Sequence, residues 1–145
     1  MLGSISTHST GMPTLDARGD FARARRAQLR ARVLRRLVGR RRPDHPRTLP
    51  DAAARPARAG RLEVIPLEGI VGTVEPSPQF DARFRPVSAH LRARWERIAL
   101  AHRTGAGLPP IAVLRGPGGY YVLDGRHRVS VALAAGRRDI DAWVR

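Results

Sequence analysis

The sequence predicts a mixed α/β (α+β) fold, in which a compact domain follows an arginine-rich helical arm. Three observations lead to this prediction. In the second half of the chain, short apolar runs typical of buried strands alternate with longer helical patterns. Residues 40–60 are rich in proline, arginine and alanine, as linkers are. Residues 16–39 contain no proline and many alanines, arginines and leucines, which favours a helix.

These patterns divide the chain into four regions. Residues 1–15 are small and polar, so we expect a disordered tail. The basic helix occupies 16–39, the linker 40–60, and the compact globular domain 61–145. The formal net charge is +15, and all 27 basic residues are arginine. Codon usage of a GC-rich genome accounts for the missing lysine, but it does not account for the excess of positive charge.

Two helices and five extended segments are expected in the globular region. The helices cover residues 87–103, with Ser88 as N-cap, and 126–135. The extended segments are 62–67, 69–74, 111–114, 120–123 and 140–144. A hairpin at 116–119 joins the third segment to the fourth. Both tryptophans, Trp95 and Trp143, are expected in the core.

Composition excludes several classes of chemistry. The chain has no cysteine, so disulfides, thiolate catalysis and cysteine-ligated zinc are excluded. The five histidines show no metal-ligand spacing, and we expect no metal site. No run of about 18 apolar residues is present, and the first residues do not resemble a signal peptide. A cytoplasmic protein is therefore expected.

The most informative stretch is a predicted strand, turn and helix. The apolar run 120–123 is followed by turn residues Asp124 and Gly125, and the helix begins with Arg126, His127 and Arg128. The first turn of a helix offers free N–H groups and the positive end of the dipole, so anions bind there. Cationic side chains oppose that dipole. A bound phosphate would explain their placement.

Each residue of this turn has a predicted role. Gly125 provides a positive φ or allows close approach of an anion. His127 and Arg128 are expected to contact phosphate, and Arg126 either does so or points to solvent. Asp124 is a candidate general base, magnesium ligand or N-cap of the helix.

Three residues outside the turn are candidates for the same site. Thr73 is a candidate phosphate contact. Glu68 and Glu75 are the acidic residues near the opening strand that could act as a base in phosphoryl transfer, and the sequence does not choose between them. A solvated surface role is the alternative for both.

The basic helix has a thin apolar stripe, formed by Phe21, Ala24, Gln28, Ala31, Leu34 (or Val33) and Leu37. It is either a solvated or loosely packed arm, or it binds DNA or RNA. The weak apolar face disfavours a membrane-surface helix, so no membrane partner is expected. The candidate nucleic-acid contacts are Arg25, Arg26, Arg30, Arg35, Arg36, Arg40, Arg41 and Arg42.

Four segments, in the right order, resemble the ParB/sulfiredoxin superfamily. They are Val64-Ile65-Pro66-Leu67 with Ile70, Leu108-Pro109-Pro110-Ile111 with Val113, Tyr121 to Arg128, and Ile140 with Ala142 and Val144. The signature Asp-Gly-x-His-Arg-Val-Ser-Val-Ala is most similar to that of bacterial ParB-like proteins. Gly72-Thr73-Val74 and the pair Phe80-Asp81 also resemble segments of these proteins.

The resemblance implies a nucleotide site at the strand-turn-helix. Members of the superfamily bind CTP (ParB), ATP (sulfiredoxin) or another nucleotide (the free-serine kinase) there. Carried over by position, Gly125, His127 and Arg128 would hold a triphosphate, CTP or ATP, together with Mg²⁺. Arg126 stands where sulfiredoxin has its reactive cysteine. Sulfiredoxin chemistry is therefore excluded.

Three functions follow as hypotheses. In the first, the chain binds a nucleotide as ligand or switch, and the basic helix adds nonspecific affinity for nucleic acid. In the second, it is a small-molecule kinase of the free-serine-kinase type that uses ATP or ADP. In the third, it is a DNA-binding scaffold that needs no nucleotide. Whether the chain forms a homodimer is left open by the sequence.

Overall fold

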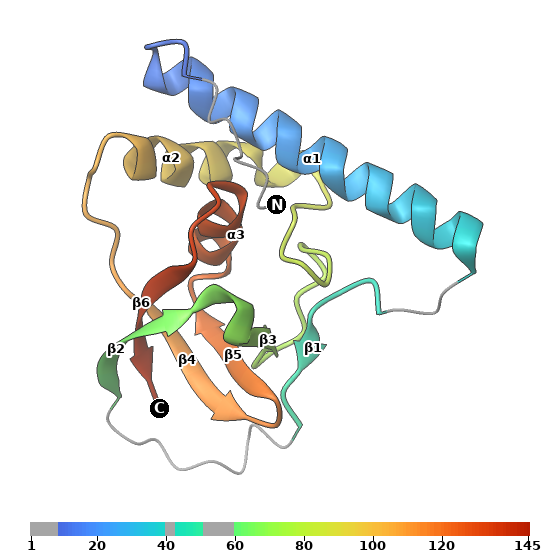
Figure 1. The fold of residues 1–145 in the computed structure, drawn as a ribbon, viewed down its shortest axis with the longest axis vertical. Coiled ribbons are helices and arrows are strands. Elements are labelled where there is room, and N and C mark those ends of the chain that lie inside the picture. Colours follow the sequence, from blue (N-terminus) through green and yellow to red (C-terminus); the bar gives the residue numbers. More distant parts are fainter. Residues whose placement is uncertain (1–8, 40–42, 51–59) are drawn as a thin grey trace, which may run out of the picture.

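The computed structural model describes residues 9–39, 43–50 and 60–145. Figure 1 shows three helices gathered on one side of a sheet. The helices are α1 (Pro13–Val38), α2 (Arg92–Arg103) and α3 (Arg126–Ala134), with short 3-10 turns η2 (Leu67–Gly69) and η3 (Ala89–Leu91). The strands are β1 (Arg47–Thr48), β2 (Arg61–Pro66), β3 (Ile70–Thr73), β4 (Ile111–Gly116), β5 (Gly119–Asp124) and β6 (Asp139–Val144). The predicted mixed α/β class is confirmed.

The strands form one mixed sheet in the order β1-β3-β5-β4-β6-β2. β4 and β5 pair as the predicted antiparallel hairpin, and β2 pairs antiparallel with β6. β3 runs parallel to β5, and β4 runs parallel to β6. The carboxyl ends of β3 and β5 therefore lie at the same edge of the sheet, where α3 begins.

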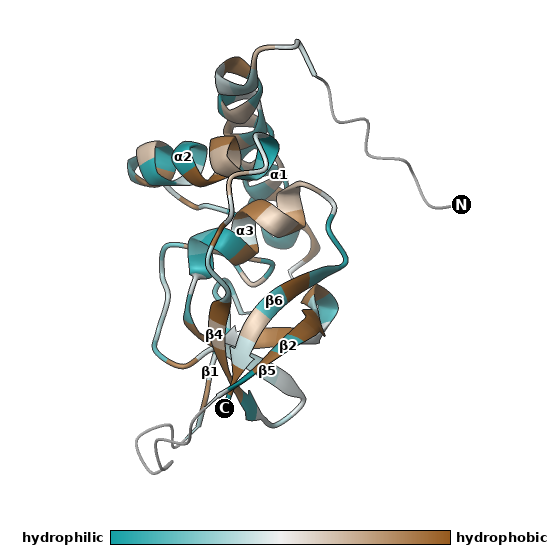
Figure 2. Ribbon diagram, turned by 90° about the vertical axis from the view of Figure 1, so that its left-hand side faces the viewer, coloured by the Kyte–Doolittle hydropathy of each residue, from teal (hydrophilic) through white to brown (hydrophobic). Residues whose placement is uncertain are grey.

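The main core lies between the sheet and α3. It contains side chains from the strands, such as Ile65, Ile111 and Val122, and Val129 of α3. Figure 2 shows apolar residues concentrated in the strands, whereas α1 and α2 alternate between hydrophilic and hydrophobic residues. Trp143 was expected in this core but is 44 % exposed, because it lies on the sheet face opposite to the buried Ala142 and Val144.

A second core joins α1, α2 and α3. Phe21 of α1 is fully buried, and its ring packs edge-on against Trp95 of α2 at 5.6 Å between centroids. Arg103 of α2 donates two hydrogen bonds to the carboxylate of Asp20 in α1. Both apolar and ionic contacts therefore hold helix α1 against the rest of the domain.

Burial of the predicted apolar stripe stops halfway along α1. Phe21, Ala24 and Gln28 are buried as expected. Val33, Leu34 and Leu37 are exposed instead, because they lie past the part of α1 that packs on α2.

Segments expected to be tail and linker contain ordered structure. Helix α1 begins at Pro13, and before it the backbone N–H of Thr10 donates to Asp16, which holds the pKa of that carboxyl below its ordinary value. β1 lies in the expected linker and pairs with β3. A side chain at Gly72 would meet the carbonyl of Arg47 at 2.1 Å, so glycine makes this pairing possible. Residues 1–8, 40–42 and 51–59 lie outside the described residues.

If α1 belongs to the folded core, Phe21→Ala should lower the free energy of unfolding by about 3–5 kcal/mol, since a large side chain leaves a cavity. The exposed Leu37 of the same helix provides the control, and Leu37→Ala should change stability by less than about 0.5 kcal/mol. Urea denaturation of both variants checks this. Equal and small losses would show that α1 is not part of the core.

Candidate anion-binding site at the N-terminus of α3

The turn between β5 and α3 depends on a glycine. Gly125 is the N-cap residue of α3 and has φ 103° and ψ 23°. A Cβ at this position would lie 2.5 Å from Cγ2 of Ile111 in the neighbouring β4. Both the backbone conformation and the close packing therefore require glycine. The predicted positive φ at Gly125 is confirmed.

The N-terminus of α3 carries no side-chain cap and no acidic residue in its first turn. The first hydrogen bond of the helix runs from Val129 N–H to the Gly125 carbonyl. Within the described part of the chain, the N–H groups of Arg126, His127 and Arg128 have no acceptor. The Asp124 carboxylate, one candidate cap, accepts a hydrogen bond from Arg128 instead. The cap interpretation of Asp124 is therefore wrong.

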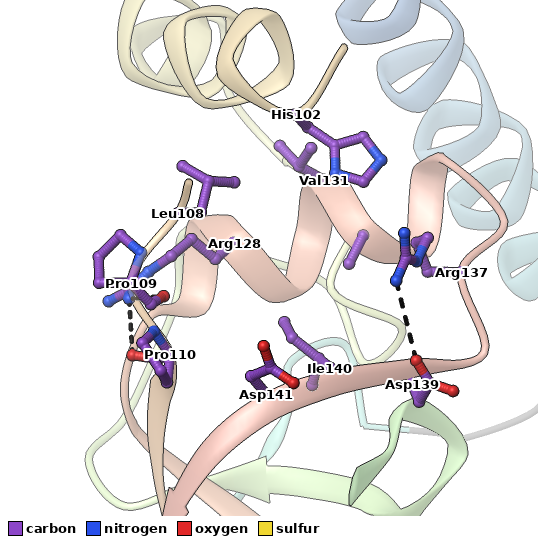
Figure 3. Close-up of a pocket in the computed structure, with 11 residues that line it drawn as sticks. His102, Leu108, Pro109, Pro110, Arg128, Val131, Arg137, Asp139, Ile140 and Asp141 are labelled. Carbon is purple, nitrogen blue, oxygen red and sulfur yellow. Dashed lines mark hydrogen bonds and ion pairs between the residues drawn. The ribbon is translucent and has the colours of Figure 1, made fainter. Parts of the chain in front are cut away.

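The side chain of Arg128 stabilises the turn through three internal hydrogen bonds. Its Nη1 donates to the carbonyls of Pro109 and Pro110 at 2.6 and 2.8 Å, and its Nη2 donates to Asp124 at 2.6 Å. Figure 3 shows the guanidinium beside the two prolines. Phosphate binding by Arg128 stays a prediction, but three internal acceptors already occupy this side chain.

His127 is buried and uncharged. Its exposed fraction is 9 %, and its ring packs edge-on against Phe80 with centroids 5.1 Å apart. Burial, reinforced by the positive charges of Arg94 and Arg126, lowers the pKa of His127 to about 4. Its Nε2 atom is buried without a hydrogen-bond partner in the described chain. A buried polar nitrogen without a partner is costly, which marks this position as functional or strained.

Arg94 and Arg126 bring positive charge to this end of α3 from two helices. Arg94 lies on α2 and is exposed, and no side chain or carbonyl of the described residues pairs with it. Arg126 has one ionic neighbour, Glu75, at 3.8 Å. Arg94 is not among the candidate site residues of the sequence analysis. No motif or spacing in the sequence marks it, because its influence on α3 depends on how α2 packs on α3.

The structure brings Glu75 to the turn but not Glu68. Because β3 runs parallel to β5 with Ile70 opposite Tyr120, Glu68 lies beside the start of β5. The turn follows the other end of β5, about 13 Å further along the strand. Glu75 follows β3 and reaches Arg126. Thr73 is fully buried, and its hydroxyl donates to the Glu75 carbonyl at 2.6 Å, so it is occupied inside the protein.

Some of the candidate arginines of α1 form hydrogen bonds or ion pairs within the protein, and others are exposed. Arg25 donates to Gln28 and to the carbonyl of Pro86, and Arg35 lies 3.2 Å from Asp44. Arg26, Arg30 and Arg36 are exposed. Arg40, Arg41 and Arg42 lie outside the described residues. Nucleic-acid binding by this set of arginines stays a prediction.

Two cavities lie apart from the cluster of Arg94, Arg126 and His127. One, of about 150 Å³, lies between α3 and β6 and is lined by residues such as His102, Arg128 and Asp141 (Figure 3). The other, of about 800 Å³, lies between α1, α2 and α3. Neither of these two cavities is lined by the three residues of the cluster.

In the described ranges, no three His, Asp or Glu side chains are grouped so that they could hold a metal ion. Among the helices of the described chain, none has the length and apolar character that crossing a membrane requires.

Comparison with known proteins gives a partial likeness of fold. No protein-family model matches the chain, and no curated protein matches it. The structure is similar to the crystal structure of sulfiredoxin from Arabidopsis thaliana, with a TM-score of 0.43 and 24 % sequence identity. The similarity covers 59 % of this chain and 84 % of that one. The similarity concerns the fold alone.

Replacing Gly125 should be costly for two separate reasons. Gly125→Ala forces a side chain into a positive φ, at about 1–3 kcal/mol, and into Ile111, at about 1–3 kcal/mol more. Gly118 in the β4–β5 hairpin has φ 83° but open space around it, so Gly118→Ala should show only the first cost. Urea denaturation compares the two, and equal losses would contradict the close packing on Ile111.

Proposed function

We propose that the chain binds the phosphate groups of a nucleotide at the N-terminus of α3. One observation carries the proposal: the uncapped N-terminus of α3 carries Arg126 in its first turn beside the buried, unpartnered His127. The charge of Arg94 on α2 also acts on His127 and contributes to lowering its pKa. All of these groups favour an anion. Within the described residues, Glu75 is the acid paired with this cluster, and its side chain is 77 % exposed.

The free N–H groups of the first turn of α3 would donate to phosphate oxygens, and the two guanidinium groups would flank them. In the free protein, the positive charges of the arginines repel each other and the positive end of the α3 dipole. A bound polyphosphate would remove that repulsion. The negative charge of the polyphosphate would also stabilise the protonated, positively charged form of His127.

The resemblance to the ParB/sulfiredoxin superfamily supports a triphosphate, CTP or ATP with Mg²⁺, as the ligand. Mg²⁺ binds by one or two carboxylates together with substrate phosphates. Asp124 and Glu75 are the carboxylates next to the turn, and both are largely exposed. The metal would accordingly arrive with the nucleotide.

Calorimetric titration with CTP, ATP, ADP, GTP and inorganic triphosphate tests the proposal. Arg94→Ala/Arg126→Ala should weaken binding at least about tenfold, since hydrogen bonds to charged groups contribute about 1.5–3 kcal/mol each. Arg97→Ala/Arg138→Ala removes the same charge from exposed positions away from the turn and should change affinity little. No saturable binding by any of the five, or equal losses in both variants, would refute the site. Binding of inorganic triphosphate alone would refute base recognition only.

A kinase is the second candidate, because Glu75 lies near the proposed phosphate position. Phosphoryl transfer needs a carboxylate that orients the attacking hydroxyl, with most of the catalysis coming from positioning and charge neutralisation. The Glu75 carboxylate is 3.8 Å from Arg126, whereas Glu68 lies at the far end of β3. Analysis of the titrated samples for nucleoside diphosphate separates turnover from binding.

A further inference from the structure

The end of α1 projects beyond the rest of the fold. We call residues 29–38 the α1 tip. Gln28 is the last buried residue of the helix, and Val38 follows ten residues later, about 15 Å further along the axis. Figure 1 shows α1 extending past α2 in this direction. Eight of the ten residues of the tip are exposed, all except Ala31 and Arg35, so most of its surface is free for contact with another surface.

The α1 tip exposes a concentration of large apolar side chains. Five of its ten residues are leucine or valine, and each is between 45 % and 77 % exposed: Leu29, Val33, Leu34, Leu37 and Val38. Isolated exposed apolar residues are ordinary, but a contiguous group marks an interaction surface.

The same segment is strongly basic. The tip holds four arginines and no acidic residue, and three more arginines follow directly at 40–42. Arg30, Arg32 and Arg36 form neither hydrogen bonds nor ion pairs with the described residues. Arg35 lies near Asp44. The binding partner must therefore be both anionic and able to accept apolar side chains.

The combination of exposed apolar side chains and positive charge fits some classes of partner better than others. A second copy of the tip would bury the leucines but bring like charges together. A nucleic acid would neutralise the arginines through its phosphates and leave the leucines and valines in water. An anionic bilayer satisfies both, since apolar side chains insert at the headgroup boundary while arginines meet lipid phosphates.

We propose that the α1 tip binds the surface of anionic lipid bilayers. At roughly 100° per residue, Val33, Leu34 and Leu37 point largely away from the side of α1 that carries the buried Phe21, Ala24 and Gln28. The folded domain therefore does not block them. Arg30 lies within the apolar arc, where its long side chain can extend to the headgroups.

Val33, Leu34 and Leu37 belong to the stripe whose weakness led to the expectation of no membrane partner. The first half of that stripe, Phe21 to Gln28, is buried against the domain, and its exposed end combines with Leu29 and Val38 into a larger apolar surface. The proposal is independent of phosphate binding at α3, because none of the α1 tip residues belongs to that site.

Co-sedimentation with vesicles tests the proposal on the full chain. We expect binding to phosphatidylglycerol-containing vesicles, weakened by salt, and little binding to pure phosphatidylcholine. Leu34→Ser/Leu37→Ser keeps the charge and should reduce binding at least about tenfold, because two apolar side chains no longer insert. Leu62→Ser/Val64→Ser makes the same change at similarly exposed positions of β2 and should leave binding unchanged.

Three results would overturn the proposal. Vesicle binding that is insensitive to Leu34→Ser/Leu37→Ser would mean simple charge attraction. Binding to duplex DNA or RNA without binding to vesicles would assign the tip to nucleic acid. Self-association that is lost in the same double variant, without vesicle binding, would assign it to a second copy of the chain.

Discussion

The buried indole of Trp95 joins the three helices and fixes how they meet. It is fully buried in α2, packs edge-on against Phe21 of α1, and donates from Nε1 to the hydroxyl of Ser130 in α3 at 2.8 Å. A buried indole needs both apolar contact and a hydrogen-bond acceptor, and here each comes from a different helix. This one residue thus sets the position of α2 over α3, and of α1 over α2.

The chemistry of the α3 N-terminus follows from that arrangement. Trp95 holds α2 against α3. The pKa of His127 at the start of α3 is lowered by burial, and the charges of Arg94 on α2 and of Arg126 lower it further. Gly125 directly follows β5, and the side chain of Ile111 in the neighbouring strand β4 packs closely against it. Positive charge thus gathers at the positive end of a helix dipole, where it destabilises the free protein. Sites that break a local rule in this way are expected where a ligand supplies the missing charge.

Local chemistry could be predicted from the sequence, whereas long-range packing could not. Ser88 caps its helix segment by accepting from His90 N–H, and Gly125 adopts its positive φ, because both depend on near neighbours. The braced position of Arg128 depends on the carbonyls of Pro109 and Pro110, about twenty residues away in the chain. Contacts between residues far apart in the sequence also determine how α1 packs on the domain and why Trp143 is exposed. The same holds for the effect of Arg94 on His127. The sequence did not predict β1, because a strand of two residues is too short to show an alternating hydrophobic pattern.

The imidazole of His127 reports on the central claim, that Arg94, Arg126 and the N-terminus of α3 form an anion site. NMR titration of its ring protons should give a midpoint near 4 in the free protein, since burial and two arginines oppose the charged form. With saturating inorganic triphosphate the midpoint should rise, because the anion offsets both arginines and the protein takes up a proton on binding. A midpoint near the ordinary value of 6.5 in the free protein, or one that triphosphate leaves unchanged, would contradict the account.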